Sequence, residues 1–123
     1  MKKHLFFFAV IFFTSSCFAF AQNKIDKYCQ VIIGPKNGLT TKRIAKISFG
    51  DNKDLFALKD TTVFQKLHFN VDHMVTETDV LNYMSKSGWT LVDIHSAFQY
   101  NHYEVIYFKK AFDISELAET PSN

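Results

Sequence analysis

The sequence predicts an α+β fold in which a largely antiparallel sheet of four to six strands carries one helix on one face. Three observations lead to this fold class. Several short runs of β-branched and aromatic residues are separated by turn residues. One segment, residues 76–88, carries a full set of helix signals. The 102 residues that follow the first 21 are enough for one domain and no more.

The first two strands are expected at residues 27–33 and 41–49, joined as a hairpin. The turn residues Gly34 to Gly38 separate them. In the second strand, polarity alternates along the chain, which is typical of a strand with one buried face. One face consists of Thr41, Arg43, Ala45, Ile47 and Phe49, and the other of Lys42, Ile44, Lys46 and Ser48.

The middle of the chain has the weakest pattern. Residues 55–58 and 63–69 are each predicted to form a short strand, with residues 59–62 as the turn between them. Toward the C-terminus, residues 89–95 and 103–109 are predicted to be strands of a second hairpin, whose tip lies at residues 100–102.

The predicted helix has signals at both ends. Thr76 can cap its N-terminus, and Asp79, three residues on, can reach back as in a capping box. Apolar residues at positions 80, 81, 83 and 84 form a stripe at helical spacing. Gly88 supplies the left-handed residue that commonly ends a helix.

The first 21 residues have the organisation of a cleavable secretory signal peptide. Lys2 and Lys3 form a positive start, and residues 5–13 are an unbroken apolar run. This run is shorter than the roughly 20 residues that a membrane-spanning helix needs. Ala19-Phe20-Ala21 is a small-x-small cleavage pattern, so we expect the mature chain to begin at Gln22 and to be exported by a bacterium to the periplasm or the medium.

A second processing route is open. Thr14-Ser15-Ser16-Cys17 resembles a degenerate lipobox, in which Cys17 would be lipidated and become the new N-terminus. Thr14 stands where a standard lipobox has Leu, and the residues after Cys17 are apolar. Export of a free domain is the favoured route, and a lipid anchor at Cys17 is the alternative.

Composition narrows the class of partner. Residues 22–123 contain 12 basic and 12 acidic residues, so there is no basic surface for nucleic acid and we predict no nucleic-acid partner. We expect no transmembrane segment in the mature chain. Residues 22–112 are predicted to form the single domain, and residues 113–123 a flexible tail.

Two segments carry a resemblance to known families. The first segment is residues 79–92, which include Asp79-Val80-Leu81-Asn82-Tyr83-Met84 and Gly88-Trp89. The second is Tyr107-Phe108-Lys109-Lys110, at the end of a predicted strand. This arrangement resembles small domains of unknown function of the DUF4177 type, and small exported proteins of Bacteroidetes. The resemblance implies a fold and an exported location, and it brings no catalytic residues with it.

Candidate chemistry is sparse. The four histidines after the signal segment, His68, His73, His95 and His102, lack the paired close spacing of a structural zinc site, so we predict no metal and no cofactor. Cys29 loses its potential partner if Cys17 is removed, and its apolar neighbours indicate a buried side chain. A hydrolytic pair of Cys29 with His95 or His102 requires that the fold bring them together.

Aromatic residues toward the C-terminal hairpin are the candidate binding surface. Exposed aromatic rings can bind sugars, peptides or another protein. The residues concerned are Trp89, Phe98, Tyr100, Tyr103 and Tyr107. We therefore predict a non-enzymatic exported binding or structural module that uses the open sheet face or this hairpin, with a protein or cell-envelope component as partner. A small periplasmic hydrolase using Cys29 is the alternative.

Overall fold

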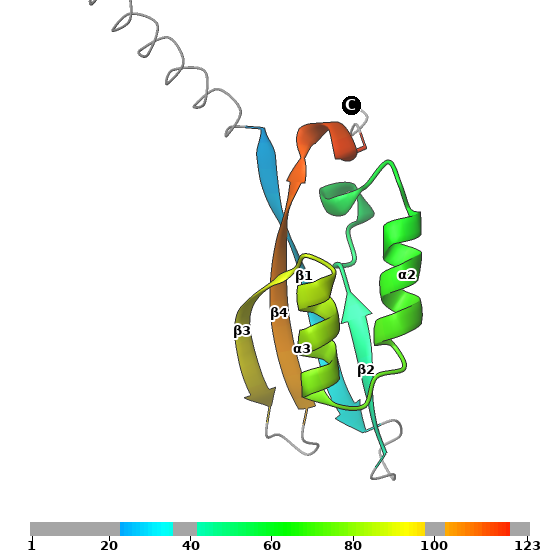
Figure 1. Cartoon of the computed structure of the whole chain (residues 1–123), viewed down its shortest axis with the longest axis vertical. Coiled ribbons are helices and arrows are strands. Elements are labelled where there is room, and N and C mark those ends of the chain that lie inside the picture. Colours follow the sequence, from blue (N-terminus) through cyan, green and yellow to red (C-terminus); the bar gives the residue numbers. More distant parts are fainter. Residues whose placement is uncertain (1–22, 36–41, 98–102, 119–123) are drawn as a thin grey trace, which may run out of the picture.

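A four-stranded antiparallel sheet with two helices on one face forms the domain (Figure 1). The computed structural model describes residues 23–35, 42–97 and 103–118. The strands are β1 (Lys24–Pro35), β2 (Arg43–Ser48), β3 (Thr90–Ala97) and β4 (Tyr103–Asp113). Their order in the sheet is β2-β1-β4-β3, so the first and last strands of the chain lie side by side in the centre.

The helices are α2 (Thr62–Val71) and α3 (Glu77–Lys86), with short 3₁₀ helices η1 (Lys53–Phe56) and η2 (Ile114–Glu116). The predicted α+β class and the antiparallel sheet are confirmed, and the antiparallel pairing of β1 with β2 and of β3 with β4 agrees with the two expected hairpins. The prediction of a single helix is wrong, because a second helix replaces the strand expected at residues 63–69.

The segment predicted as a strand at residues 63–69 is part of α2. Its buried residues are Leu67 and Val71, and Val63 and Phe64 also pack against the core. These four positions share one face only at helical spacing, so the apolar contacts decide in favour of a helix. Local β propensity had favoured a strand, and tertiary packing overrides it here.

Side chains before η1 and α2 stabilise the starts of both. Asn52 Oδ1 accepts a hydrogen bond from Asp54 N at 3.0 Å. Asp60 Oδ1 accepts from Thr62 N at 2.9 Å and from Thr62 Oγ1 at 2.7 Å. These bonds to the Thr62 amide and hydroxyl lower the pKa of the exposed Asp60 carboxyl below its usual value. Residues 55–58, also predicted as a strand, instead complete η1 and enter a single β-bridge between Leu58 and Leu117.

The predicted ends of α3 are confirmed. Thr76 is the N-cap, and its Oγ1 accepts from Asp79 N at 3.1 Å. The Asp79 carboxylate reaches back to the Thr76 hydroxyl, at 2.6 Å from Oγ1. Gly88 follows the helix with φ of +83°, a conformation that a side chain would disfavour.

The core lies between the sheet and the two helices. Every second residue of each central strand points into it, as the pleat of a strand requires. Ala45 and Ile47, which the alternation places on one face of β2, are both buried. The other buried hydrophobic side chains of the strands are Cys29, Val31, Ile33, Ile106, Phe108 and Phe112.

The opposite face of the sheet carries no helix in the described part of the chain, and we call it the open face. Ile32 and Val105 are paired on it and half-buried, with Lys46 and His95 as their outer neighbours. At the β3 edge a bulge between Leu91 and Asp93 shifts the register. The open face is therefore a mixture of apolar and charged side chains.

The start of the segment predicted as a tail is hydrogen-bonded to the domain. Lys59 N donates to Glu116 O at 3.0 Å, and Ala118 N donates to Ala57 O at 3.0 Å. Leu117 packs against the core. These contacts close the end of the domain beside η1.

Candidate functional site

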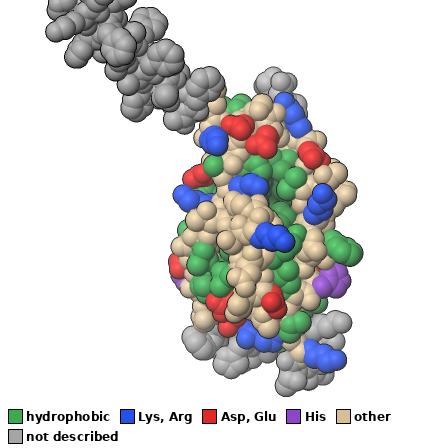
Figure 2. Space-filling model, in the orientation of Figure 1, with side chains coloured by type: hydrophobic (Ala, Val, Ile, Leu, Met, Phe, Trp, Pro, Cys, Tyr) green, Lys and Arg blue, Asp and Glu red, His purple; other side chains and the backbone are tan. Residues whose placement is uncertain are grey.

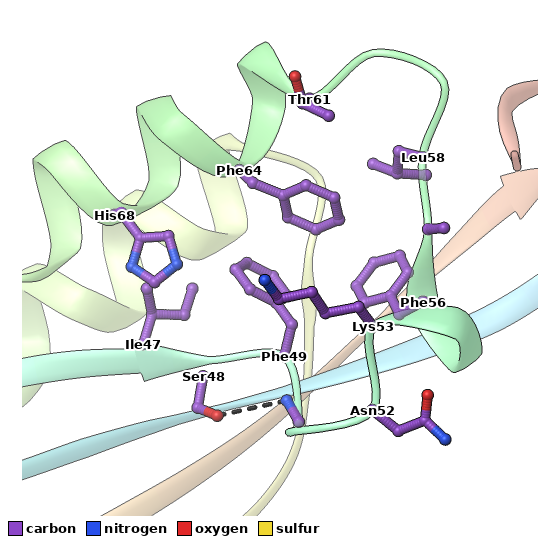
Figure 3. A pocket seen from close by; sticks show the side chains of 12 residues that line it. Ile47, Ser48, Phe49, Asn52, Lys53, Phe56, Leu58, Thr61, Phe64 and His68 are labelled. Carbon is purple, nitrogen blue, oxygen red and sulfur yellow. Dashed lines mark hydrogen bonds between the residues drawn. The ribbon is translucent and has the colours of Figure 1, made fainter.

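A cavity of about 430 Å³ opens between the end of β2, η1 and the first half of α2 (Figure 3). We call it the aromatic pocket. Most of its lining is apolar, and the apolar side chains are Ile47, Phe49, Phe56, Leu58 and Phe64. All three segments that build it come from residues 47–68, so a single stretch of chain folds back on itself to form it.

Local backbone chemistry explains why the chain turns here. Strand β2 ends at Ser48, whose Oγ accepts from Gly50 N at 3.3 Å. Gly50 has φ of +93°, which a glycine adopts without strain. The Asn52 side chain then starts η1, and this short helix directs Phe56 inward, where it is only 8% exposed. The turn at Gly50 and the Asn52 cap of η1 therefore position Phe56 in the pocket.

Three phenylalanine rings form the floor of the pocket. Their centroids lie 5.5 Å apart for Phe49 and Phe56, 4.6 Å for Phe49 and Phe64, and 5.1 Å for Phe56 and Phe64, all in edge-to-face geometry. Trp89 and Phe112 continue the same cluster into the core, with ring centroids 6.0 Å apart. Each edge-to-face pair stabilises this arrangement by roughly 0.5–1.5 kcal/mol beyond burial, so the floor is fixed in shape.

Polar side chains surround this floor. The ionisable residues of the lining are Lys53 and His68, and none of the described lining residues is acidic. Figure 3 shows the Lys53 side chain extended from η1 toward Phe49, and the His68 ring on α2 facing the same space. Neutral polar groups complete the rim, and they belong to Ser48, Asn52 and Thr61.

The His68 ring is held by Asp72. Asp72 Oδ2 lies 3.1 Å from His68 Nδ1, and Asp72 Oδ1 accepts from Ile47 N at 2.9 Å. Because an ionised carboxylate only accepts hydrogen bonds, His68 Nδ1 carries the proton. The second ring nitrogen, Nε2, then points toward Phe49 and the pocket (Figure 3). Asp72 thus ties the end of α2 to β2 and orients the imidazole at the same time.

Cys29 lies on the covered face of the sheet and is 4% exposed. Desolvation by burial raises the pKa of its thiol from 9.0 to about 12, which keeps it protonated and poorly nucleophilic at neutral pH. His95 lies on the open face and pairs with Asp93, with 2.9 Å between Nε2 and Oδ2. The sheet therefore separates Cys29 from His95, and His102 lies outside the described residues.

The other candidate metal ligands have local partners. His73 Nδ1 lies 3.0 Å from Phe69 O, one turn earlier in the chain. His68 is engaged with Asp72. In the described ranges, no three His, Cys, Asp or Glu side chains form a cluster that could hold a metal ion.

The predicted aromatic surface is divided by the fold. Trp89 is 3% exposed and belongs to the core, so it is unavailable to a ligand. Tyr107 is 37% exposed on the open face, beside the His95 ring at 5.9 Å. Tyr103 is half-buried on the same face, where its ring covers Gly34. Phe98 and Tyr100 lie outside the described residues.

Sequence reasoning missed the aromatic pocket because its residues fall in the stretch with the weakest pattern. Two local signals could have located it. The side chains of Asn52 and Asp60 each accept a hydrogen bond from the backbone amide two residues later. Residues of this type at such spacing indicate a turn at both positions. A helix from Thr62 then places Phe64 and His68 one turn apart on the same side.

The outer surface on the helix-bearing side shows acidic and basic side chains interspersed around apolar areas (Figure 2). Across residues 23–35, 42–97 and 103–118, no helix is long and apolar enough to cross a membrane. Comparison with protein families, with curated proteins and with solved structures finds no match for this chain.

Proposed function

We propose that this protein is an exported, non-enzymatic binding module that takes a small apolar ligand into the aromatic pocket. The observation that supports this proposal is the cavity of about 430 Å³ floored by Phe49, Phe56 and Phe64. Small-molecule sites are typically preformed cavities of roughly 300–1,000 Å³, mostly apolar and with a few polar groups. The pocket matches that description in size, lining and rim.

The chemistry of the described residues favours binding over hydrolysis. A cysteine nucleophile needs a lowered pKa and a base within hydrogen-bond reach. The pKa of Cys29 is raised to about 12, and His95 lies across the sheet. His68, the histidine of the pocket, is held by Asp72, and no serine hydroxyl or thiol of residues 23–35, 42–97 and 103–118 is hydrogen-bonded to it.

Export in a bacterium is part of the proposal, supported by the signal-like residues 1–21. The resemblance to DUF4177-type domains and to exported Bacteroidetes proteins stays a prediction. Intact mass of the protein from its native envelope tests the location. A mass that begins at Gln22 supports a free exported domain, a diacyl or triacyl chain on Cys17 supports the lipid-anchored alternative, and an uncleaved chain contradicts both.

Binding is tested with a neutral aromatic probe, 2-naphthamide, followed by amide chemical shifts and by calorimetry. We expect saturable binding, with the largest shift changes in residues 47–68. Phe64→Ser removes one ring of the floor and should weaken binding at least fivefold. Phe69→Ser is the matched control, because Phe69 is on the same helix but 76% exposed and outside the pocket lining.

Two results would overturn the proposal. One is the absence of saturable binding of 2-naphthamide to a protein whose spectrum shows it to be folded. The other is equal binding by the Phe64→Ser and Phe69→Ser variants, since the ligand would then occupy some other surface.

A further inference from the structure

We propose, building on the function above, that the natural ligand of the aromatic pocket is an amphipathic organic acid. Its flat apolar body would lie on the phenylalanine floor, and its carboxylate would lie at the rim between Lys53 and His68. The inference goes beyond apolar binding because it assigns the charge of the ligand and the two side chains that recognise it.

Lys53 supplies the ammonium group of the pocket lining. Three lysines elsewhere in the described residues have partners within the protein. Lys27 Nζ donates to Leu55 O at 2.6 Å, and Lys110 Nζ donates to Ser87 O at 3.0 Å. Lys109 forms an ion pair with Asp26 at 3.2 Å. Lys53 lines the pocket and has no ion pair or hydrogen-bond acceptor for its ammonium among the described residues. It is therefore available to an anion that enters the pocket.

The His68 imidazole is oriented so that one of its nitrogens faces the pocket. Asp72 holds Nδ1 at 3.1 Å and is itself fixed by the Ile47 amide at 2.9 Å. The free nitrogen, Nε2, faces the pocket (Figure 3). When the ring is protonated, Nε2 can donate a hydrogen bond to an anionic oxygen. A carboxylate can thus accept one bond from His68 and one from Lys53.

The aromatic pocket does not suit a cationic ligand. Aromatic cages that bind ammonium groups leave a gap between their rings for the cation. Here the three ring centroids lie 4.6 Å to 5.5 Å apart, so the rings contact one another and leave no such gap. Lys53 would also repel a cation. Asp51 and Asp54 lie nearby in the chain, but both are exposed and neither lines the pocket.

The test compares 2-naphthoate with its neutral analogue 2-naphthamide, which has nearly the same shape. We expect the acid to bind about fivefold to tenfold more tightly to the wild-type protein, as for charge-assisted hydrogen bonds at a partly exposed site. Lys53→Gln and His68→Gln should each reduce this preference, because each weakens binding of the acid more than binding of the amide. Lys66→Gln is the matched control, because Lys66 is an exposed lysine of α2 outside the pocket lining.

Each other outcome has a defined meaning. Equal affinity for the acid and the amide would overturn the anionic head group while leaving the apolar binding function in place. A Lys53→Gln variant that loses affinity for both probes equally would overturn recognition of charge by Lys53. Failure of both probes to bind would overturn the proposed function and this inference together.

Discussion

The ring of Tyr103 on β4 lies directly over Gly34 on β1, on the open face of the sheet. A Cβ atom at position 34 would overlap Cδ1 and Cε1 of the Tyr103 ring. Gly34 is consequently buried although no helix covers it. A glycine within a strand has no side chain to pack, and an aromatic ring from the neighbouring strand compensates for this loss.

Gly34→Ala should destabilise the domain by about 1–3 kcal/mol, because the added methyl group displaces the Tyr103 ring. The φ of Gly34 lies outside the left-handed region, so backbone strain does not contribute. Urea unfolding of the single and double variants measures the coupling. In a Tyr103→Ala background the cost should fall below about 1 kcal/mol, and an unchanged cost there would contradict the contact.

Alkaline pH should destabilise the protein through Cys29. Its pKa is raised from 9.0 to about 12 by burial, so the folded state holds the proton while the unfolded chain releases it. The contribution of this group to the free energy of unfolding is therefore complete below pH 9.0 and is lost as the pH rises toward about 12. Near pH 10.5 the loss should reach about 2 kcal/mol.

Cys29→Ala is the reference for that measurement. The variant lacks a titrating thiol, so between pH 9 and 10.5 its free energy of unfolding should fall less steeply than that of the wild type. Lysine and tyrosine titration affects both proteins equally and cancels in the difference. Parallel curves would show that the thiol is not shielded from water.

Asp72→Asn should change the tautomer of His68. The new amide can still accept from Ile47 N, but it presents a donor to His68 Nδ1, so the imidazole proton should move to Nε2. Nitrogen-15 shifts of the ring report the tautomer directly. Asp93→Asn, beside His95, is the matched control and should leave His68 unchanged. Retention of the Nδ1 proton in Asp72→Asn would refute the orientation of His68 by Asp72.

Thr76→Ala should cost about 1 kcal/mol of stability, because it removes the side-chain acceptor of Asp79 N at the start of α3. Thr76→Ser keeps that acceptor and should cost little. Thr78→Ala, two residues later on an exposed position, gives the background effect of losing a threonine. Thermal unfolding distinguishes the three variants, and equal losses for Thr76→Ala and Thr78→Ala would show that the cap does not contribute.

The parts of the fold that could be predicted from the sequence are those determined by neighbouring residues. Thr76, Asp79 and Gly88 lie close together in the chain, and their hydrogen bonds and φ preference mark the ends of α3 without any tertiary contact. The alternation of Ala45 and Ile47 similarly indicates a strand with one buried face.

The second helix and the site depend on contacts that the sequence pattern does not reveal. Residues 63–69 have β-branched and aromatic members that suit either a strand or a helix, and packing of Leu67 and Val71 under the sheet decides between them. Trp89 is a candidate surface residue by type but lies in the core, because aromatic type alone does not distinguish core from interface. The aromatic pocket requires β2, η1 and α2 to meet, which is a property of the assembled fold.

The central position of β1 and β4 determines when the sheet can form. Their register joins Lys24 to Asp113, so the two inner strands pair across almost the whole length of the domain. As the chain emerges from the ribosome, β1 has only the edge strand β2 as a partner until the last strand has been synthesised. Formation of the sheet therefore depends on contacts between residues far apart in the sequence, and such contacts slow folding.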